Sequence, residues 1–276
     1  MKFIVILYEN ICYYFNNIYR IGMYMVKANN KFILKAKRRR LVRRIGIISI
    51  ILIIGGAIFA TKSDVFNIKK VAILGNPIMS GEDVKKRTEN LIGQNIFFIN
   101  KHNIISEAKK NPYVENVEIS KVYPKQVNIK VSEKQGIYYV EKDGYKYILD
   151  GQANLLEKTD NVENRNLVNV IGIDLKDVEL GNKTLVNSRL LEFLDVFYQI
   201  IKNNPTNYNI DVIDLSDLMN IKVYIGKVEG RIGDDENIPD KMNKLLHIIE
   251  NPDIGITKGY VDVGFDGAPV YYKEER

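Results

Sequence analysis

One uninterrupted apolar run divides the chain into two parts of different character. The run extends from Ile45 to Thr61, reads IGIISIILIIGGAIFAT and holds no charged residue. Its seventeen residues would extend about 25 Å as a helix, the lower end of what a bilayer core of about 30 Å requires. The pattern therefore predicts a single transmembrane helix over 45–61.

Two other interpretations fit an apolar run near the start of a chain. A cleaved signal peptide also pairs a basic region with an apolar core, and Gly55 with Ala57 would serve as a small-residue cleavage site. A core helix of a soluble protein would show an amphipathic stripe, whereas Ser49 is the only polar residue before Thr61. We favour the membrane anchor because of its full apolar length and the long basic segment that precedes it.

The residues before the apolar run predict its orientation. From Lys27 to Arg44 the chain has nine basic residues and no acidic one. By the positive-inside rule we expect residues 1–44 to form a basic cytoplasmic tail and the rest of the chain to lie outside the cytoplasm. The residues expected to fix this orientation are Lys37, Arg38, Arg39, Arg40, Arg43 and Arg44. Met23 or Met25 is the preferred true start, because the basic tail follows directly.

The net charge of the chain is distributed unevenly on the two sides of Thr61. The whole sequence carries +6, but the part up to Thr61 holds eleven basic residues and one acidic residue. The body that follows has 29 basic and 33 acidic residues, a net charge of −4. The basic excess belongs to the membrane flank and gives no argument for nucleic-acid binding. Cys12 is the only cysteine, which excludes an intrachain disulfide and a thiol-rich metal site.

After the anchor, strand-like and helix-like spacings alternate over about seventy residues. The expected elements are a strand over 65–74, a helix from Ser80 to Gly93, a helix over 101–110, and strands over 117–120 and 127–132. Ser80 and Asp83 form a capping-box-like helix start, and Tyr123-Pro124 is the expected turn between the last two strands. The order β-α-α-β-β predicts a small sheet with two helices on one face.

A second strand-rich unit with two helices follows, so the predicted fold class is α+β. Asp143-Gly144 is a strong hairpin signal, and Asp266-Gly267 joins the last two strands. The expected elements are strands over 137–140 and 145–149, a helix over 188–202, strands over 210–215 and 221–225, a helix over 240–250, and strands over 260–265 and 269–272. Both helices carry an apolar stripe at helical spacing.

Several stretches in this order resemble one family. The stretches are VAILGN at 71–76, GQNIF at 93–97, NPYV at 111–114 and YPKQVNIKVSEK at 123–134. They resemble the POTRA domain of the bacterial cell-division proteins FtsQ and DivIB, and the later elements, with YVDV at 260–263, resemble the β domain of that family. The resemblance implies a POTRA domain over 62–134 and a β domain over 135–276.

Nothing in the sequence forms a recognisable catalytic or metal-binding motif. His102 and His247 are the only histidines, and each is interpreted as a packed or surface residue of a helix. The acidic cluster at 234–236 is interpreted as a solvated turn, since it lacks the spaced oxygen ligands of a calcium loop. The scattered carboxylates leave one alternative open, a pair of catalytic carboxylates of the kind that glycosidases use. We expect no enzyme activity, no cofactor, no metal and no small-molecule substrate.

The feature that predicts function is an exposed sheet edge at the C-terminal end. An edge strand has unpaired N–H and C=O groups that a partner strand can complete. Pro269 suits an edge position, and the tyrosines that follow offer amphipathic contact area. By resemblance, the expected partner-binding residues are Tyr260, Val270, Tyr271 and Tyr272. The alternative is that these side chains simply pack on the sheet.

The resemblance thus implies a non-catalytic divisome scaffold in the plasma membrane, enriched at the division septum. The implied partners are FtsB/DivIC-like and FtsL-like coiled-coil proteins and a septal transpeptidase. Two alternatives are an exported cell-wall enzyme or its regulator, and a POTRA-bearing component of polypeptide transport. The lack of a reactive motif disfavours the first, and the lack of repeated POTRA units disfavours the second.

Overall fold

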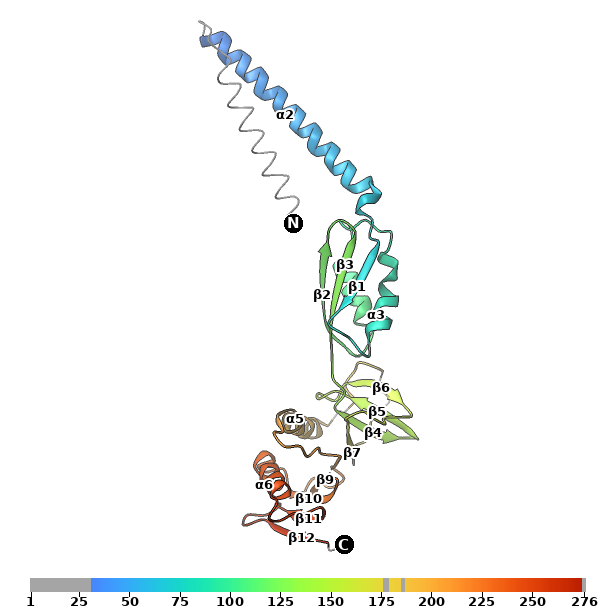
Figure 1. Ribbon diagram of the computed structural model, residues 1–276, viewed down its shortest axis with the longest axis vertical. Coiled ribbons are helices and arrows are strands. Elements are labelled where there is room, and N and C mark those ends of the chain that lie inside the picture. The colour runs from blue at the N-terminus through green and yellow to red at the C-terminus, as the bar shows by residue number, and fades with distance from the viewer. Residues whose placement is uncertain (1–30, 176–178, 185–186, 275–276) are drawn as a thin grey trace. The chain divides into compact units, whose positions relative to one another are not determined.

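The computed structural model of the chain describes residues 31–175, 179–184 and 187–274 (Figure 1). The chain forms two compact units, Met1–Phe66 and Asn67–Arg276. The second unit contains two separate sheets, and we call residues 67–134 the first sheet module and residues 135–274 the second sheet module. Cys12 and the expected starts Met23 and Met25 lie outside the described residues.

The apolar run lies inside a longer helix, α2, which spans Lys31–Lys62. Among the described residues, α2 is the one helix long and apolar enough to cross a membrane. It begins well before the expected span of 45–61, because the basic segment is rich in Lys, Arg and Leu, which are good helix formers, and holds neither Gly nor Pro between residues 31 and 44. The hydroxyl of Ser49 donates to the carbonyl of Ile45 at 2.9 Å, which satisfies the polar side chain within the helix itself.

The first sheet module has the predicted order β-α-α-β-β. Its elements are β1 (Lys70–Leu74), α3 (Gly81–Thr88), the 3-10 turn η2 (Glu89–Leu91), α4 (Lys101–Ala108), β2 (Val114–Val122) and β3 (Gln126–Glu133). The strand order is β1-β3-β2, with β3 parallel to β1 and antiparallel to β2. The expected strand over 65–74 is wrong in its first half, because residues Asp64–Phe66 form a 3-10 turn, η1.

The core of this module lies between the sheet and its two helices. The central strand β3 directs Val127, Ile129 and Val131 inward, and all three are fully buried. Ile104 and Ala108 of α4 are buried with them, as the helical spacing of these residues predicts. Alternation along one strand and i, i+4 spacing along one helix therefore define the same core.

The backbone just before α3 is held by a residue far away in the sequence. Ser80 precedes the helix, but its side chain makes no capping hydrogen bond, so the predicted capping box is wrong. The carboxylate of Glu133, at the end of β3, instead accepts hydrogen bonds from the backbone N–H groups of Ile78, Met79 and Ser80. These hydrogen bonds have a charged acceptor, and charge-assisted hydrogen bonds are the stronger ones.

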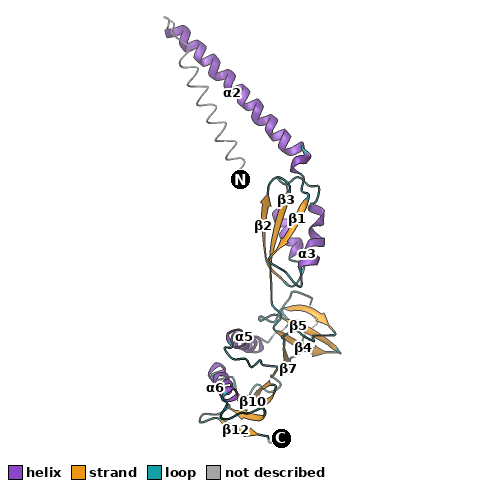
Figure 2. Ribbon diagram, viewed as in Figure 1, coloured by secondary structure: helices purple, strands orange, loops and turns teal. Residues whose placement is uncertain are grey.

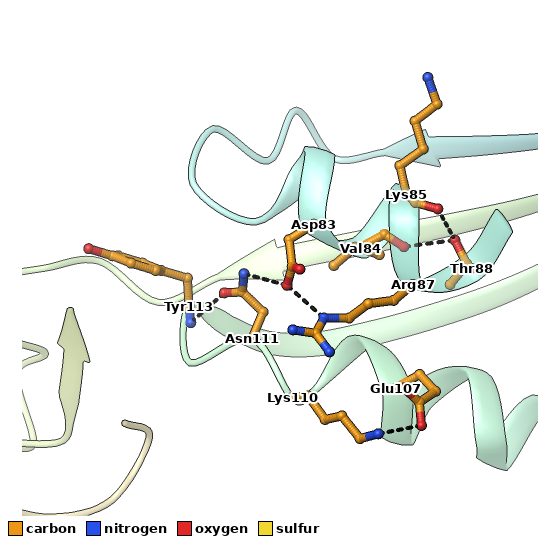
Figure 3. Close-up of polar contacts among 9 residues, drawn as sticks. All are labelled: Asp83, Val84, Lys85, Arg87, Thr88, Glu107, Lys110, Asn111 and Tyr113. Carbon is orange, nitrogen blue, oxygen red and sulfur yellow. Dashed lines mark hydrogen bonds and ion pairs between the residues drawn. The ribbon is translucent and has the colours of Figure 1, made fainter. Parts of the chain in front are cut away.

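A polar cluster links α3 to the turn before β2 (Figure 3). The Asp83 carboxylate accepts from Arg87 Nε at 2.8 Å and from Asn111 Nδ2 at 2.9 Å, and Asn111 Oδ1 accepts from the Tyr113 N–H at 3.0 Å. The hydrogen bond from Arg87 is the main cause that lowers the pKa of Asp83, against the opposing effect of burial. The carboxylate therefore stays ionised and holds the helix and the turn together.

The second sheet module has one large sheet and two long helices (Figure 2). Its elements are β4 (Tyr138–Lys142), β5 (Tyr145–Leu149), β6 (Leu155–Thr159), β7 (Val168–Ile171), α5 (Ser188–Asn203), β8 (Val212–Asp214), β9 (Ile221–Ile225), β10 (Lys227–Gly233), α6 (Ile238–Glu250), β11 (Lys258–Asp262) and β12 (Val270–Lys273). The strand order is β12-β11-β10-β9-β8-β7-β4-β5-β6. The sequence missed β6, β7 and β10, and it placed Pro269 inside a strand that begins at Val270.

Both helices pack their predicted apolar stripes into one continuous core. Leu194 and Phe197 of α5 and Met242 and Leu245 of α6 are fully buried. The buried hydroxyl of Tyr138 donates to the Leu194 carbonyl at 2.7 Å, so the ring fills the core while its polar end is satisfied. The helices thereby cover one face of the sheet, and the opposite face of β9, β10 and β11 carries polar and aromatic side chains.

Candidate partner-binding edge

The C-terminal strand β12 forms one outer edge of the large sheet. It pairs antiparallel with β11 only, through Tyr260 opposite Tyr272, Val261 opposite Tyr271 and Asp262 opposite Val270. Every residue of β12 is exposed, including Tyr271 at 48% and Tyr272 at 54%. The expected edge is thus confirmed as a structural feature of the fold, whereas its role in binding remains a prediction.

The hydrogen-bonding pattern determines which backbone groups face outward. The Glu274 N–H donates to the Lys258 carbonyl, which makes these two residues a hydrogen-bonded pair of the antiparallel ladder. Since hydrogen-bonded pairs alternate with non-bonded ones, Tyr272 and Val270 also bond toward β11. Tyr271 and Lys273 therefore present their N–H and C=O groups to the open side of the strand.

The side chains of three predicted residues share one face of the sheet. The rings of Tyr260 and Tyr272 stack with centroids 5.7 Å apart and planes 26° apart. Val270 is two residues from Tyr272 and lies on the same face. The exposed aromatic surface is therefore held in one conformation by a cross-strand pair, which lowers the entropy cost of binding a partner.

Tyr271 lies on the other face of the sheet. Its cross-strand partner is Val261, which is fully buried under the helices, yet Tyr271 itself stays half exposed. The neighbouring Lys273 reaches from the same face to the Ile254 carbonyl at 3.3 Å. The four predicted residues are thus brought together on two adjacent strands, but a partner would have to contact both faces of the edge to reach them all.

Gly259 permits the close approach of β12 to β11. Its φ of 127° lies in a region that favours glycine, and a Cβ at this position would collide with the carbonyl oxygen of Tyr272. The residue opposite it in the ladder is Lys273. A glycine is therefore required here for the edge strand to pair at all.

Sequence reasoning missed a cationic group beside the aromatic pair. The Arg231 guanidinium carbon lies 3.8 Å from the Tyr260 ring centroid, and Arg231 Nε donates to Glu229 at 2.8 Å. Both Arg231 and Glu229 are on β10, the strand that was not predicted. Polar residues alternate with Val228, Gly230 and Ile232 there, and this period of two was the signal that could have revealed the strand.

The residues predicted to fix membrane orientation all lie on α2. Lys37, Arg38, Arg39, Arg40, Arg43 and Arg44 are exposed, and they precede the apolar part of the same continuous helix. This placement fits a helix whose charged end stays in the headgroup region or beyond it, because charged side chains are costly in the bilayer core. The direction of insertion remains a prediction.

The described residues contain no group of three or more His, Cys, Asp or Glu that could hold a metal ion. Both histidines, His102 and His247, are exposed on helices. In the acidic turn, Asp234 pairs with Lys241 at 2.6 Å and Asp235 pairs with Arg189 at 2.8 Å. These carboxylates bind cationic side chains of the chain itself.

The fold and the comparisons with known proteins define the class of the protein. Residues 66–134 match the family model described as the FtsQ-type POTRA domain. Together with α2, this match makes the chain a single-pass membrane protein with a POTRA domain and a large mixed sheet.

Known relatives extend the likeness over most of the chain. It is 30% identical to the cell division protein DivIB of Clostridium botulinum (strain Hall) over 250 residues, which is 90% of this chain and 98% of that one. It is 32% identical to DivIB of Clostridium acetobutylicum over 207 residues, 75% of this chain and 82% of that one. It is 24% identical to the cell division protein FtsQ of Syntrophotalea carbinolica over 215 residues, 75% and 72% of the two chains. The chain belongs to the DivIB/FtsQ family of cell division proteins.

Proposed function

We propose that the chain is a non-catalytic scaffold of the cell-division complex, which recruits and stabilises partner proteins at the membrane during septum formation. The observation that carries this proposal is the exposed edge of β12, with two backbone positions facing outward beside a stacked tyrosine pair. The proposed partners are small coiled-coil division proteins of the DivIC and FtsL type and, through them, a septal transpeptidase. Membership of a cell-division family supports this choice of partner.

The proposed mechanism is strand addition followed by tethering. A partner segment would extend the sheet by hydrogen-bonding to Tyr271 and Lys273, and its side chains would contact Tyr260, Val270 and Tyr272 on one face. The membrane helix would then keep the bound partners at high local concentration in the plane of the membrane. The supporting assignments are a cytoplasmic tail over 1–44, an anchor over 45–61, a POTRA domain over 62–134 and a β domain over 135–276, with both domains outside the cytoplasm.

Two substitutions of Tyr271 distinguish the contribution of the outward backbone N–H from that of the side chain. Tyr271→Pro removes an outward N–H without removing a hydrogen bond to β11, whereas Tyr271→Ala removes the ring and keeps the N–H. We expect Tyr271→Pro to weaken binding of the organism's own DivIC-like and FtsL-like proteins about tenfold, measured on the full chain in detergent or nanodiscs. Deletion of residues 269–272 should abolish binding and leave the first sheet module folded. Unchanged affinity in both variants would reject the site.

Cellular localisation tests the role of the whole chain. A fluorescent protein fused to the N-terminus of a functional full-length chain is expected to concentrate at the septum of dividing cells. Recruitment and partner binding are separate properties, so a septal band that persists in the 269–272 deletion would assign recruitment to another part of the chain. Uniform signal around the envelope would contradict the proposed division role.

A further inference from the structure

One end of the first sheet module carries exposed apolar side chains that its fold does not require. This end is where β1 begins, β2 ends and β3 begins, and it is built from residues 67–70, 90–101 and 119–128 (Figure 1). Phe98 is 66% exposed and Ile92 is 55% exposed, and Val122 and Tyr123 are exposed on the neighbouring turn. Leu91, Ile96 and Ile99 already fill the core from the same segment. An exposed apolar patch of this kind marks an interaction surface.

Hydrogen bonds hold the three segments together at this end. The Gly93 N–H donates to the Ile68 carbonyl and the Lys69 N–H to the Lys125 carbonyl, at 2.9 Å and 2.8 Å. Lys121 Nζ donates to the Phe97 carbonyl at 3.4 Å, and the centroids of the Phe97 and Tyr123 rings lie 5.3 Å apart. These contacts join the three segments at one end of the module.

The loop that presents Phe98 is fixed by its own backbone contacts. The Phe98 N–H donates to the Asn95 carbonyl at 3.0 Å, and the Phe97 N–H donates to Asn95 Oδ1 at 3.0 Å. The Ile92 N–H donates to the Glu89 carbonyl at 3.0 Å. Both apolar side chains are consequently held outward by a loop that is already ordered, which reduces the entropy lost when they bind.

The same end is strongly basic. Its three segments hold five lysines, namely Lys69, Lys70, Lys101, Lys121 and Lys125, and no acidic residue. Burial, with the positive charge of Lys101, lowers the pKa of Lys121. Apolar and aromatic side chains surrounded by lysines match the two layers of a lipid interface, where rings enter the acyl boundary and ammonium groups meet the phosphates.

The chain that joins this end to the anchor is short. The helix α2 ends at Lys62, and Asn67 begins the first sheet module five residues later. Five residues extend at most about 18 Å, and the headgroup layer itself is about 5–8 Å thick on each side. A basic aromatic surface on so short a connection stays within reach of the lipid headgroups.

We propose that this surface, formed by Ile92, Phe98, Val122 and Tyr123 with the surrounding lysines, binds the lipid interface beside the anchor and prefers anionic lipid. Contact at this point would restrict the rotation of the first sheet module about its tether. The proposal rests on the membrane helix and is independent of any partner at β12.

The absence of tryptophan from the chain allows a direct test. Phe98→Trp introduces a single fluorescent reporter at the patch, and Phe265→Trp, at an exposed phenylalanine of the second sheet module, is the matched control. Each full-length variant is reconstituted into vesicles of phosphatidylcholine and phosphatidylglycerol in equal parts, with and without brominated phosphatidylcholine. We expect the tryptophan emission of the Phe98→Trp variant to be blue-shifted and quenched roughly twofold more strongly than that of the control.

Two further measurements decide whether the surface binds lipid or a protein. Lys69→Gln with Lys70→Gln, in the Phe98→Trp chain, should reduce quenching in vesicles with phosphatidylglycerol and leave it unchanged in pure phosphatidylcholine. Equal quenching of the two reporters would overturn the proposal. A second result would also overturn it: no quenching of the tryptophan at residue 98 by brominated lipid, together with protection from iodide in native membranes. That result would assign the surface to a protein partner. Unchanged far-ultraviolet circular dichroism confirms that each variant is folded, and partner affinity at β12 should not change.

Discussion

Gly259 shows how a single residue controls the candidate edge. Its backbone angle is unfavourable for other residues, and an added Cβ would collide with the Tyr272 carbonyl. We expect Gly259→Ala to move β12 away from β11, to destabilise this part of the sheet by about 1–3 kcal/mol and to weaken partner binding. Amide hydrogen exchange across β11 and β12, together with partner affinity, measures both effects.

A second glycine supplies the control for that substitution. Gly226, in the turn between β9 and β10, also has a positive φ, but nothing lies within 4 Å of a Cβ built there. The φ of Gly226 is 59°, so Gly226→Ala tests a positive φ without the collision. We expect it to destabilise the fold slightly and to leave partner affinity unchanged. Equal losses of affinity in the two variants would contradict the role assigned to Gly259.

The lowered pKa of Asp83 predicts that the stability of the first sheet module depends on pH. The Arg87 and Asn111 contacts lower its pKa in the folded state below the value of about 3.9 found in unfolded chains. A depressed carboxyl pKa contributes stability that is present above the unfolded pKa and is lost as the pH falls through the folded pKa. We expect protection from hydrogen exchange in α3 to fall below about pH 4 and to fall less steeply in Asp83→Asn. The exposed Asp266→Asn should keep the wild-type slope, and a slope unchanged in Asp83→Asn would exclude this residue as the cause.

Among the elements, α3 depends on a contact from the far end of its own module. Three backbone N–H groups before the helix donate to Glu133, whereas the buried Ser80 Oγ has no hydrogen-bond partner among the described residues. We expect Glu133→Gln to destabilise the module by about 1–3 kcal/mol, since it replaces a charged acceptor of three hydrogen bonds. Ser80→Ala should change the free energy of unfolding by less than about 0.5 kcal/mol. Denaturant unfolding measures the free energy of unfolding of both variants. A larger loss of stability in Ser80→Ala than in Glu133→Gln would contradict this assignment and favour the predicted capping box.

The same example explains how much of each element the sequence could predict. The helices α5 and α6 were predicted nearly to their ends because their apolar stripes act locally and continuously. The contact that holds the segment before α3 could not be predicted, because its acceptor, Glu133, lies fifty-three positions from Ser80. Hydrophobic periodicity reports burial within one element, and it carries no information on contacts between distant elements.

Strands were predicted less well than helices for a similar reason. The strand β9 was predicted with the same bounds that the structure has, because its alternation is uninterrupted. β10 was missed because Gly230 takes one of the apolar positions of its alternation and Gly233 ends the strand. The candidate edge at β12 was therefore predicted together with its tyrosines, while Arg231, which contacts Tyr260 from β10, was not.

For the whole molecule, the uneven distribution of charge is the main organising feature. The basic residues before the apolar run share one continuous helix with it, and the body that follows is net acidic. The positive-inside rule counts basic residues close to the span, and there are nine from Lys27 to Arg44 against three, Lys62, Lys69 and Lys70, in residues 62–71. This asymmetry supports an orientation in which both sheet modules lie outside the cytoplasm.

Cysteine accessibility tests this orientation in cells. In a Cys12→Ser background the chain has no other cysteine, so Ala36→Cys in the basic helix and Ser106→Cys on the exposed face of α4 each give one labelling site. We expect a membrane-impermeant maleimide to label residue 106 in intact protoplasts and residue 36 only after permeabilisation, because the charged flank is retained on the cytoplasmic side. The opposite pattern would invert the topology, and labelling of both sites in intact protoplasts would indicate mixed insertion. Either result would remove the β12 edge from partners outside the cytoplasm in at least part of the population, so this measurement decides whether the proposed scaffold acts where septum assembly requires it.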